Sequence, residues 1–164
     1  MLVRTSIALI VLMAAGTFVT AQSQSGAKPS AARPTTSKPA VPAAGEVLVT
    51  VSYTGKGIVD ATHEILVFAF SDPNINPGSR PLGPPQIITK NGGVASFKGL
   101  TAPTIYVAAF FDEKSIYDGT TPPPSGIPYE FYGATVAKPA PTGIVPGPKG
   151  AVTVKIDGAK KWKG

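Results

Sequence analysis

The sequence predicts an all-β fold, a single sandwich of about seven mainly antiparallel strands. The chain of 164 residues contains 18 glycines and 18 prolines, a proportion typical of loop-rich β proteins. Its apolar residues, 43% of the total, gather in short runs of strand length that are bounded by turn signals. After residue 21 no stretch has the periodicity of a helix. The chain therefore has enough apolar strands for a two-sheet core and no segment that predicts a helical layer.

The first 21 residues have the pattern of a secretory signal peptide. Arg4 precedes an apolar run from Ile7 to Ala15, and a small residue, Ala21, stands at the expected cleavage position. The apolar run is shorter than the ~20 residues that a membrane-spanning helix needs. An uncleaved N-terminal anchor is the alternative. The pattern predicts an exported protein, periplasmic or extracellular, with no stable membrane span once the signal is removed.

Residues 22–45 are predicted to be a disordered linker. This stretch is rich in Pro, Ala, Ser and Lys and has no aromatic residue. Such a segment buries too little apolar surface to offset its chain entropy, so it is expected to act as an extended spacer.

The β-sandwich domain is expected over residues 46–157. Residues 46–53 alternate between apolar and polar, which is typical of a half-buried strand. Residues 64–70 and 104–111 are apolar on both faces, so each is expected inside a sheet. Asn91-Gly92-Gly93 is a hairpin signal, which predicts that the strands on either side pair with each other. The predicted strands are residues 46–53, 64–70, 86–89, 94–98, 104–111, 129–137 and 150–157.

Charge and cysteine content exclude several function classes. The formal charge is +6, but residues 46–157 hold nine acidic and eight basic side chains, so the excess lies in the flanks. Residues 158–164 are expected to be a basic, solvated tail. A nearly neutral domain lacks the clustered cations of nucleic-acid readers. The chain has no cysteine, which excludes disulfides and cysteine-based metal sites.

Catalytic and metal-binding residues are scarce. His63 is the only histidine, and its neighbour Glu64 points to the opposite face of a strand, so a catalytic triad is not expected. Asp112 and Asp118 are weak candidates for a calcium loop, because Lys114 and Ile116 stand where further oxygen ligands would be needed. We expect no catalytic residue, no metal and no cofactor.

Aromatic residues around the acidic loop are the candidates for binding. Tyr117, Tyr129 and Tyr132 could stack on sugars or peptides, and Glu130 beside them is the fourth binding candidate. In the alternative interpretation Tyr129 and Phe131 close the core and Tyr132 faces solvent.

Two landmarks of this region carry a resemblance to a known family. Phe111-Asp112 ends a strand, and Gly126-Ile-Pro-Tyr-Glu-Phe-Tyr-Gly133 follows the acidic loop. Together they resemble small exported bacterial β-sandwich domains related to transthyretin-like (prealbumin-like) and carboxypeptidase-regulatory-like modules. The resemblance implies a transthyretin- or Ig-like sandwich and export. It implies no established activity, and transthyretin-like hydrolases use several histidines where this chain has one.

The function expected from the sequence is that of an exported, non-enzymatic module with a structural or binding role. Its partner is expected to be a protein or a polysaccharide, contacted through residues 71–85, 112–128 and 138–149, because loops on a rigid sandwich carry function. A carbohydrate-binding or transport-accessory module is the first alternative. A transthyretin-like hydrolase is the second and weaker one.

Overall fold

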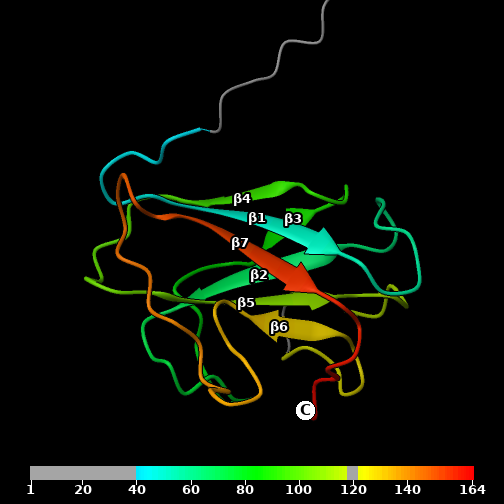
Figure 1. Cartoon of the computed structure of the whole chain (residues 1–164). Coiled ribbons are helices and arrows are strands. Elements are labelled where there is room, and N and C mark those ends of the chain that lie inside the picture. Colours follow the sequence, from blue (N-terminus) through cyan, green and yellow to red (C-terminus); the bar gives the residue numbers. More distant parts are fainter. Residues whose placement is uncertain (1–39, 118–121) are drawn as a thin grey trace, which may run out of the picture. The chain divides into compact units, whose positions relative to one another are not determined.

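The computed structural model describes residues 40–117 and 122–164, which form an all-β sandwich of two sheets (Figure 1). One sheet has three strands in the order β4-β1-β7, and the other has four in the order β3-β2-β5-β6. This confirms the predicted fold class. The strands are β1 (Val47–Tyr53), β2 (Ile65–Phe70), β3 (Gln86–Ile88), β4 (Val94–Phe97), β5 (Tyr106–Phe111), β6 (Tyr129–Phe131) and β7 (Ala151–Ile156).

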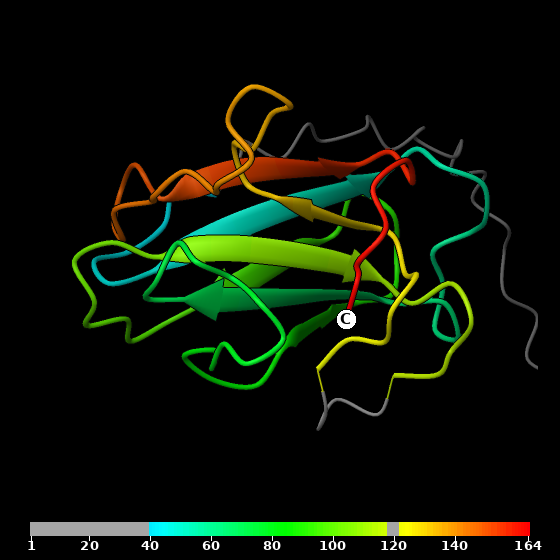
Figure 2. The same ribbon diagram turned by 90° about the horizontal axis from the view of Figure 1, so that it is seen from below.

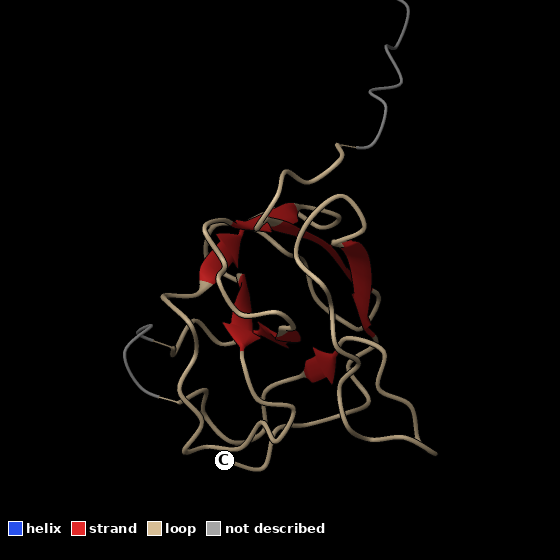
Figure 3. Ribbon diagram, turned by 90° about the vertical axis from the view of Figure 1, so that its left-hand side faces the viewer, coloured by secondary structure: helices blue, strands red, loops and turns tan. Residues whose placement is uncertain are grey.

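Every regular element in the described ranges is a strand, and long loops fill the space beside them (Figure 3). Neighbouring strands run antiparallel except β1 and β7, which pair in parallel. No helix of sufficient length and apolarity to cross a membrane occurs in the described part of the chain.

The three-stranded sheet buries one face. In β1, Val47, Val49, Val51 and Tyr53 are buried while the residues between them are partly exposed. This follows from the alternation in the sequence, because successive side chains of a strand point to opposite faces.

The four-stranded sheet buries both faces of its inner strands. Every residue of β2 is buried, as are five of the six residues of β5. The sheet order places both strands inside the sheet, as the apolar runs predict. One face of each contributes to the core between the sheets, and the other face lies on the outside of the sandwich.

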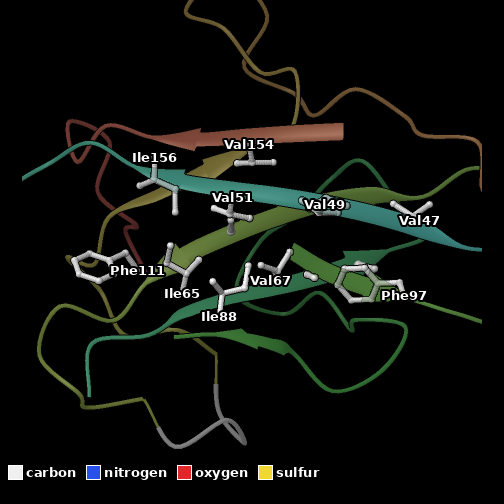
Figure 4. Packing of buried hydrophobic residues seen from close by; sticks show 14 of the residues in the cluster. Val47, Val49, Val51, Ile65, Val67, Ile88, Phe97, Phe111, Val154 and Ile156 are labelled. Carbon is white, nitrogen blue, oxygen red and sulfur yellow. The ribbon is translucent and has the colours of Figure 1, made fainter. Parts of the chain in front are cut away.

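The core between the sheets is aliphatic, with aromatic side chains at its ends (Figure 4). Val49, Val51, Ile65 and Val67 from facing sheets have no exposed surface. At one end the rings of Tyr53 and Phe111 lie 4.1 Å apart between centroids. Each such side chain stabilises the fold by roughly 1.5–3 kcal/mol through its burial, so this core holds the two sheets together.

The predicted pairing of residues 86–89 with 94–98 is wrong. β3 pairs with β2 and β4 pairs with β1, so the chain crosses between the sheets at Asn91-Gly92-Gly93. The amide of Asn91 explains the crossing, because it accepts a hydrogen bond from the Tyr53 N–H and donates one to the Tyr53 carbonyl, both at 2.8 Å. The turn therefore binds the end of β1 instead of closing a hairpin.

The predicted strand over residues 129–137 is too long. β6 ends at Phe131, and residues 131–134 form a turn in which the Ala134 N–H donates to the Phe131 carbonyl. Gly133 has a φ of 69°, which a strand does not allow. The following residues bond to each other through Thr135 and Lys138 and add no strand to the sheet.

Candidate binding site

The outer face of the four-stranded sheet carries a second apolar cluster. Leu66, Phe68 and Phe70 of β2 lie beside Ala108 and Phe110 of β5 on this face, and all five are buried. The sheet's strands are apolar on both sides, so this face must be covered by other parts of the chain. Two of the long loops and the C-terminal segment provide the cover.

The C-terminal segment, residues 158–164, packs on this face and is not a solvated tail. Trp162 is only 8% exposed. Its backbone N–H donates to the Ile127 carbonyl at 2.9 Å, and its carbonyl accepts from the Gly126 N–H at 2.7 Å. An isolated bridge pairs Pro128 with Lys161. The segment behaves as a short extra strand beside β6, because the indole has an apolar sheet face to cover.

Two lysines of this segment form ion pairs. Lys160 Nζ lies 2.5 Å from Glu130 Oε1 of β6, and Lys161 Nζ lies 3.3 Å from Glu113 Oε1. The Glu130 side chain is 15% exposed, so its pair with Lys160 is the better shielded one. The lysines of this segment predict a solvated tail in the sequence. In the structure two of them attach the segment to the domain.

Aromatic rings surround the Trp162 indole. The centroid of Phe110 lies 5.3 Å away, that of Tyr129 lies 5.4 Å away and that of Phe131 lies 6.4 Å away, all near-perpendicular to the indole. These are the edge-to-face contacts that aromatic pairs prefer. Among the described residues the buried indole N–H has no oxygen or nitrogen acceptor, so the ring is held by packing alone.

A pocket of about 220 Å³ opens beside the indole. Its walls come from β2, β5, residues 75–85, Tyr117 with residues 122–123, and the C-terminal segment. In Figure 2 the loop after β2 and the C-terminal segment lie in front of the four-stranded sheet. The lining is mostly aromatic and proline side chains: Phe68, Phe70, Phe110, Tyr117, Trp162, Pro77, Pro81, Pro84, Pro85, Pro122 and Pro123.

Sequence reasoning names only part of this pocket. It selects residues 71–85 and 112–128 as contact loops, and both contribute to the walls. It does not select Phe68, Phe110 or Trp162, and it does not single out Arg80 within residues 71–85. The apolar outer faces of β2 and β5 are visible in the sequence, but what covers them depends on where the distant loops and the chain end fold.

The predicted tyrosines do not form one surface. Tyr117 and Tyr129 pack on the outer cluster, 6.1 Å from Phe68 and 5.9 Å from Phe110 between ring centroids. Tyr132 packs against the core between the sheets, so it is separated from the other two. Only Tyr117 of the three lines the pocket.

Asp112 orders the acidic loop. Its carboxylate is buried and accepts backbone N–H bonds from Ile116 at 3.2 Å and from Tyr117 at 2.8 Å. Both oxygens are therefore used within the loop. Asp118, the other candidate for an ion site, lies outside the described residues. In the described ranges no three carboxylate or histidine side chains are grouped closely enough to hold a metal ion.

His63 has an acid partner that sequence reasoning missed. Its Nδ1 lies 3.0 Å from Asp60 Oδ1, and the same oxygen accepts the backbone N–H groups of Thr62 and His63. These bonds, first of all from the Thr62 hydroxyl and backbone, hold the pKa of Asp60 well below its usual range. The Ser115 hydroxyl donates to the Thr62 carbonyl, so this serine is engaged with the backbone of the same turn. The group is a capped turn at the start of β2.

Comparison with known proteins finds no relative from which a function could be carried over: no family model, no curated protein and no solved structure matches this chain. What is shown is the architecture, a two-sheet all-β domain of three and four strands with an apolar pocket on the outside of the larger sheet.

Proposed function

We propose that this chain is an exported, non-enzymatic module that binds a small, mainly apolar ligand in the pocket beside Trp162. The observation that carries the proposal is the pocket itself, about 220 Å³ walled by aromatic and proline side chains. Concave, mainly apolar sites of this kind are where proteins bind small molecules. The walls come from a rigid sheet and from proline-stiffened loops, so little ordering is needed before a ligand binds.

Three polar side chains that could take part in catalysis are bonded within the protein, which supports a binding role over a catalytic one. Glu130 is paired with Lys160, Asp112 is bonded to its own loop, and His63 belongs to the Asp60 turn. Each of these groups has a structural task that accounts for its position. A transthyretin-like hydrolase would need several catalytic groups directed into one channel.

Export and family membership are part of the proposal. The N-terminal signal-peptide pattern supports a periplasmic or extracellular location. The Gly-Ile-Pro segment supports kinship with transthyretin-like and carboxypeptidase-regulatory-like modules, and the sandwich of three and four strands is compatible with it. A pocket on a small exported sandwich fits a carrier or sensor of small molecules.

A sugar ligand is less well supported than an apolar one. A sugar presents several hydroxyl groups, and each needs a polar partner when it is buried. The polar side chains Asn76 and Ser79 line the pocket, but their hydrogen-bonding groups are engaged. The Ser79 hydroxyl bonds to the backbone of Asn74 and Asn76, and the Asn76 amide bonds to the backbone of Asn74 and Gly78. The aromatic and proline walls suit an apolar surface instead.

Fluorine NMR with para-fluorotoluene, a neutral ring-sized probe, tests the proposed function. We expect the probe signal to broaden in the presence of the wild-type chain. Gly83 lines the pocket, and a Cβ added there meets no atom within 4 Å, so the Gly83 position accepts a tryptophan side chain, which we expect to occupy the pocket. Gly83→Trp should abolish the broadening and Gly83→Ala should retain it. Equal broadening with both variants, each checked for folding by circular dichroism, would place the ligand elsewhere.

A further inference from the structure

We infer that the pocket selects a compact aromatic acid, a single ring that carries one carboxylate, with Arg80 as the counter-charge. This inference rests on the proposed function and names the class of ligand. Four features of the pocket carry it: its volume, its aromatic walls, the state of its polar side chains, and the sign of its charge.

The volume fits one ring with a short substituent. An apolar cavity of about 150 Å³ takes up benzene. The pocket here measures about 220 Å³, which leaves room for a few atoms beyond the ring.

The walls favour a flat aromatic body. Phe68 and Phe110 meet edge to face, with ring centroids 5.7 Å apart, and Trp162 meets Phe110 in the same way. An added ring can continue this arrangement, because each wall ring offers either a face or an edge. The proline side chains opposite are rigid and apolar, so they add contact surface without an entropy cost.

The polar side chains that line the pocket differ in whether their hydrogen-bonding groups are already engaged. Asn76 Oδ1 accepts the Gly78 N–H at 2.9 Å, and its Nδ2 donates to the Asn74 carbonyl at 3.1 Å. The Ser79 hydroxyl accepts the Asn76 N–H and donates to the Asn74 carbonyl. Arg80, by contrast, has no hydrogen bond or ion pair with any described residue. Its guanidinium retains all of its donors for a ligand.

The charge carried by the described lining of the pocket is positive. Of the described residues that line the pocket, Arg80 alone carries a formal charge. Asp72 is the acidic residue of the same loop, and it lines a neighbouring hollow with Arg80. Its Oδ1 accepts the Asn74 N–H at 2.7 Å, and no ion pair joins it to Arg80. Arg80 lines the pocket and is exposed, and a guanidinium beside an apolar site favours a planar carboxylate, which it can bind through two N–H groups.

Fluorine NMR titration of two matched probes tests the inference. The probes are para-fluorophenylacetate and its neutral amide, which have the same ring and nearly the same shape. We expect the acid to bind the wild-type chain about fivefold more tightly, the gain of a partly exposed ion pair. Arg80→Gln should reduce this ratio to about one. Lys90→Gln removes one positive charge from an exposed turn outside the pocket and should leave the ratio unchanged.

The outcomes separate the inference from the proposed function. Equal affinity for acid and amide on the wild-type chain would overturn the inference while the proposed function stands, and this comparison needs no variant. A preference for the acid that survives in Arg80→Gln would overturn the role of Arg80. If neither probe nor para-fluorotoluene binds, the proposed function itself is overturned.

Discussion

Trp162 is the residue on which the outer face of the larger sheet depends. It is the only tryptophan of the chain, it is 8% exposed, and three aromatic rings contact it. Its indole N–H has no acceptor among the described residues, so its contribution to stability comes from apolar burial and ring contacts.

Two substitutions of Trp162 should differ in their effect on stability, because the residue contributes through packing. Trp162→Ala removes the ring and should lower the free energy of unfolding by about 3 kcal/mol, the typical loss for a buried aromatic side chain. Trp162→Phe keeps an aromatic ring and loses no hydrogen bond, so it should cost about 1 kcal/mol. Urea denaturation followed by circular dichroism measures both. Equal losses for the two variants would contradict an origin in packing.

Glu46 should make stability depend on acidity. Its carboxylate accepts the Ala43 N–H and the Ser96 hydroxyl proton, both at 2.8 Å, and Lys98 lies 3.9 Å away. The backbone bond first, then the hydroxyl and the lysine, lower the pKa of Glu46 from its ordinary 4.5. The stabilisation is therefore fully present above about pH 4.5 and is lost as pH falls through the lowered folded-state pKa.

Unfolding measured from neutral pH down to about pH 3 tests this dependence, because the window spans the ordinary carboxyl range. Stability of the wild-type chain should fall in the acid part of the window. Glu46→Gln should be less stable at neutral pH and should lose less on acidification. Parallel pH profiles for the two chains would show that Glu46 does not contribute to the dependence.

At the scale of elements, short segments are held by specific side chains rather than by length. β3 and β6 have three residues each, and the C-terminal segment makes only an isolated bridge. Ladders this short provide few hydrogen bonds, so side chains such as Asn91 and Glu130 decide where the neighbouring segments attach.

The turn between β3 and β4 should depend on Asn91. Its amide makes two hydrogen bonds with the backbone of Tyr53, in a part-buried position. Asn91→Ala leaves both backbone groups without these partners and should cost about 1–3 kcal/mol. Asn91→Asp keeps the acceptor and loses the donor, so its stability should lie between that of the wild-type chain and that of Asn91→Ala. Thermal melts of the three chains give the order, and an unaffected Asn91→Ala chain would contradict the assignment.

The pair between Lys160 and Glu130 should attach the C-terminal segment to β6. A double-mutant cycle with Lys160→Met and Glu130→Gln should give a coupling energy near 1 kcal/mol, because the carboxylate is well shielded. The pair between Lys98 and Glu46 is the control. Its distance is 3.9 Å and its lysine is 77% exposed, so the coupling there should be smaller. A larger coupling energy for Lys98 and Glu46 than for Lys160 and Glu130 would contradict this prediction.

At the scale of the whole molecule, two apolar clusters share one sheet. Alternate residues of β2 and β5 face the core between the sheets and the outer cluster, so neither cluster can be lost without disturbing the same two strands. This arrangement predicts one cooperative unfolding transition for the domain.

Trp162 provides the measurement of this cooperativity. Its fluorescence reports the outer cluster alone, because the chain has no other tryptophan, while far-ultraviolet circular dichroism reports both sheets. In a urea titration the two signals should have the same midpoint. A fluorescence transition at lower urea would show that the C-terminal segment detaches before the sandwich unfolds.

The sequence alone determined most of the strands. Val47–Tyr53 alternates, and the runs in β2 and β5 are apolar on both faces, so their place in the fold follows from local pattern. Residues 86–98 and 134–137 were predicted less well, because pairing depends on partners that are distant in the chain. Asn91 reaches Tyr53, 38 residues earlier, and no turn signal contains that information.

Only the tertiary structure decided the candidate site. The pocket brings together a strand pair, residues 75–85, Tyr117 with residues 122–123, and Trp162 near the chain end. A short basic segment with one tryptophan resembles a solvated tail in the sequence, because its charges outnumber its apolar side chains. It folds onto the sheet because the outer face of β2 and β5 is apolar and needs a cover, and that requirement exists only once both strands lie in one sheet.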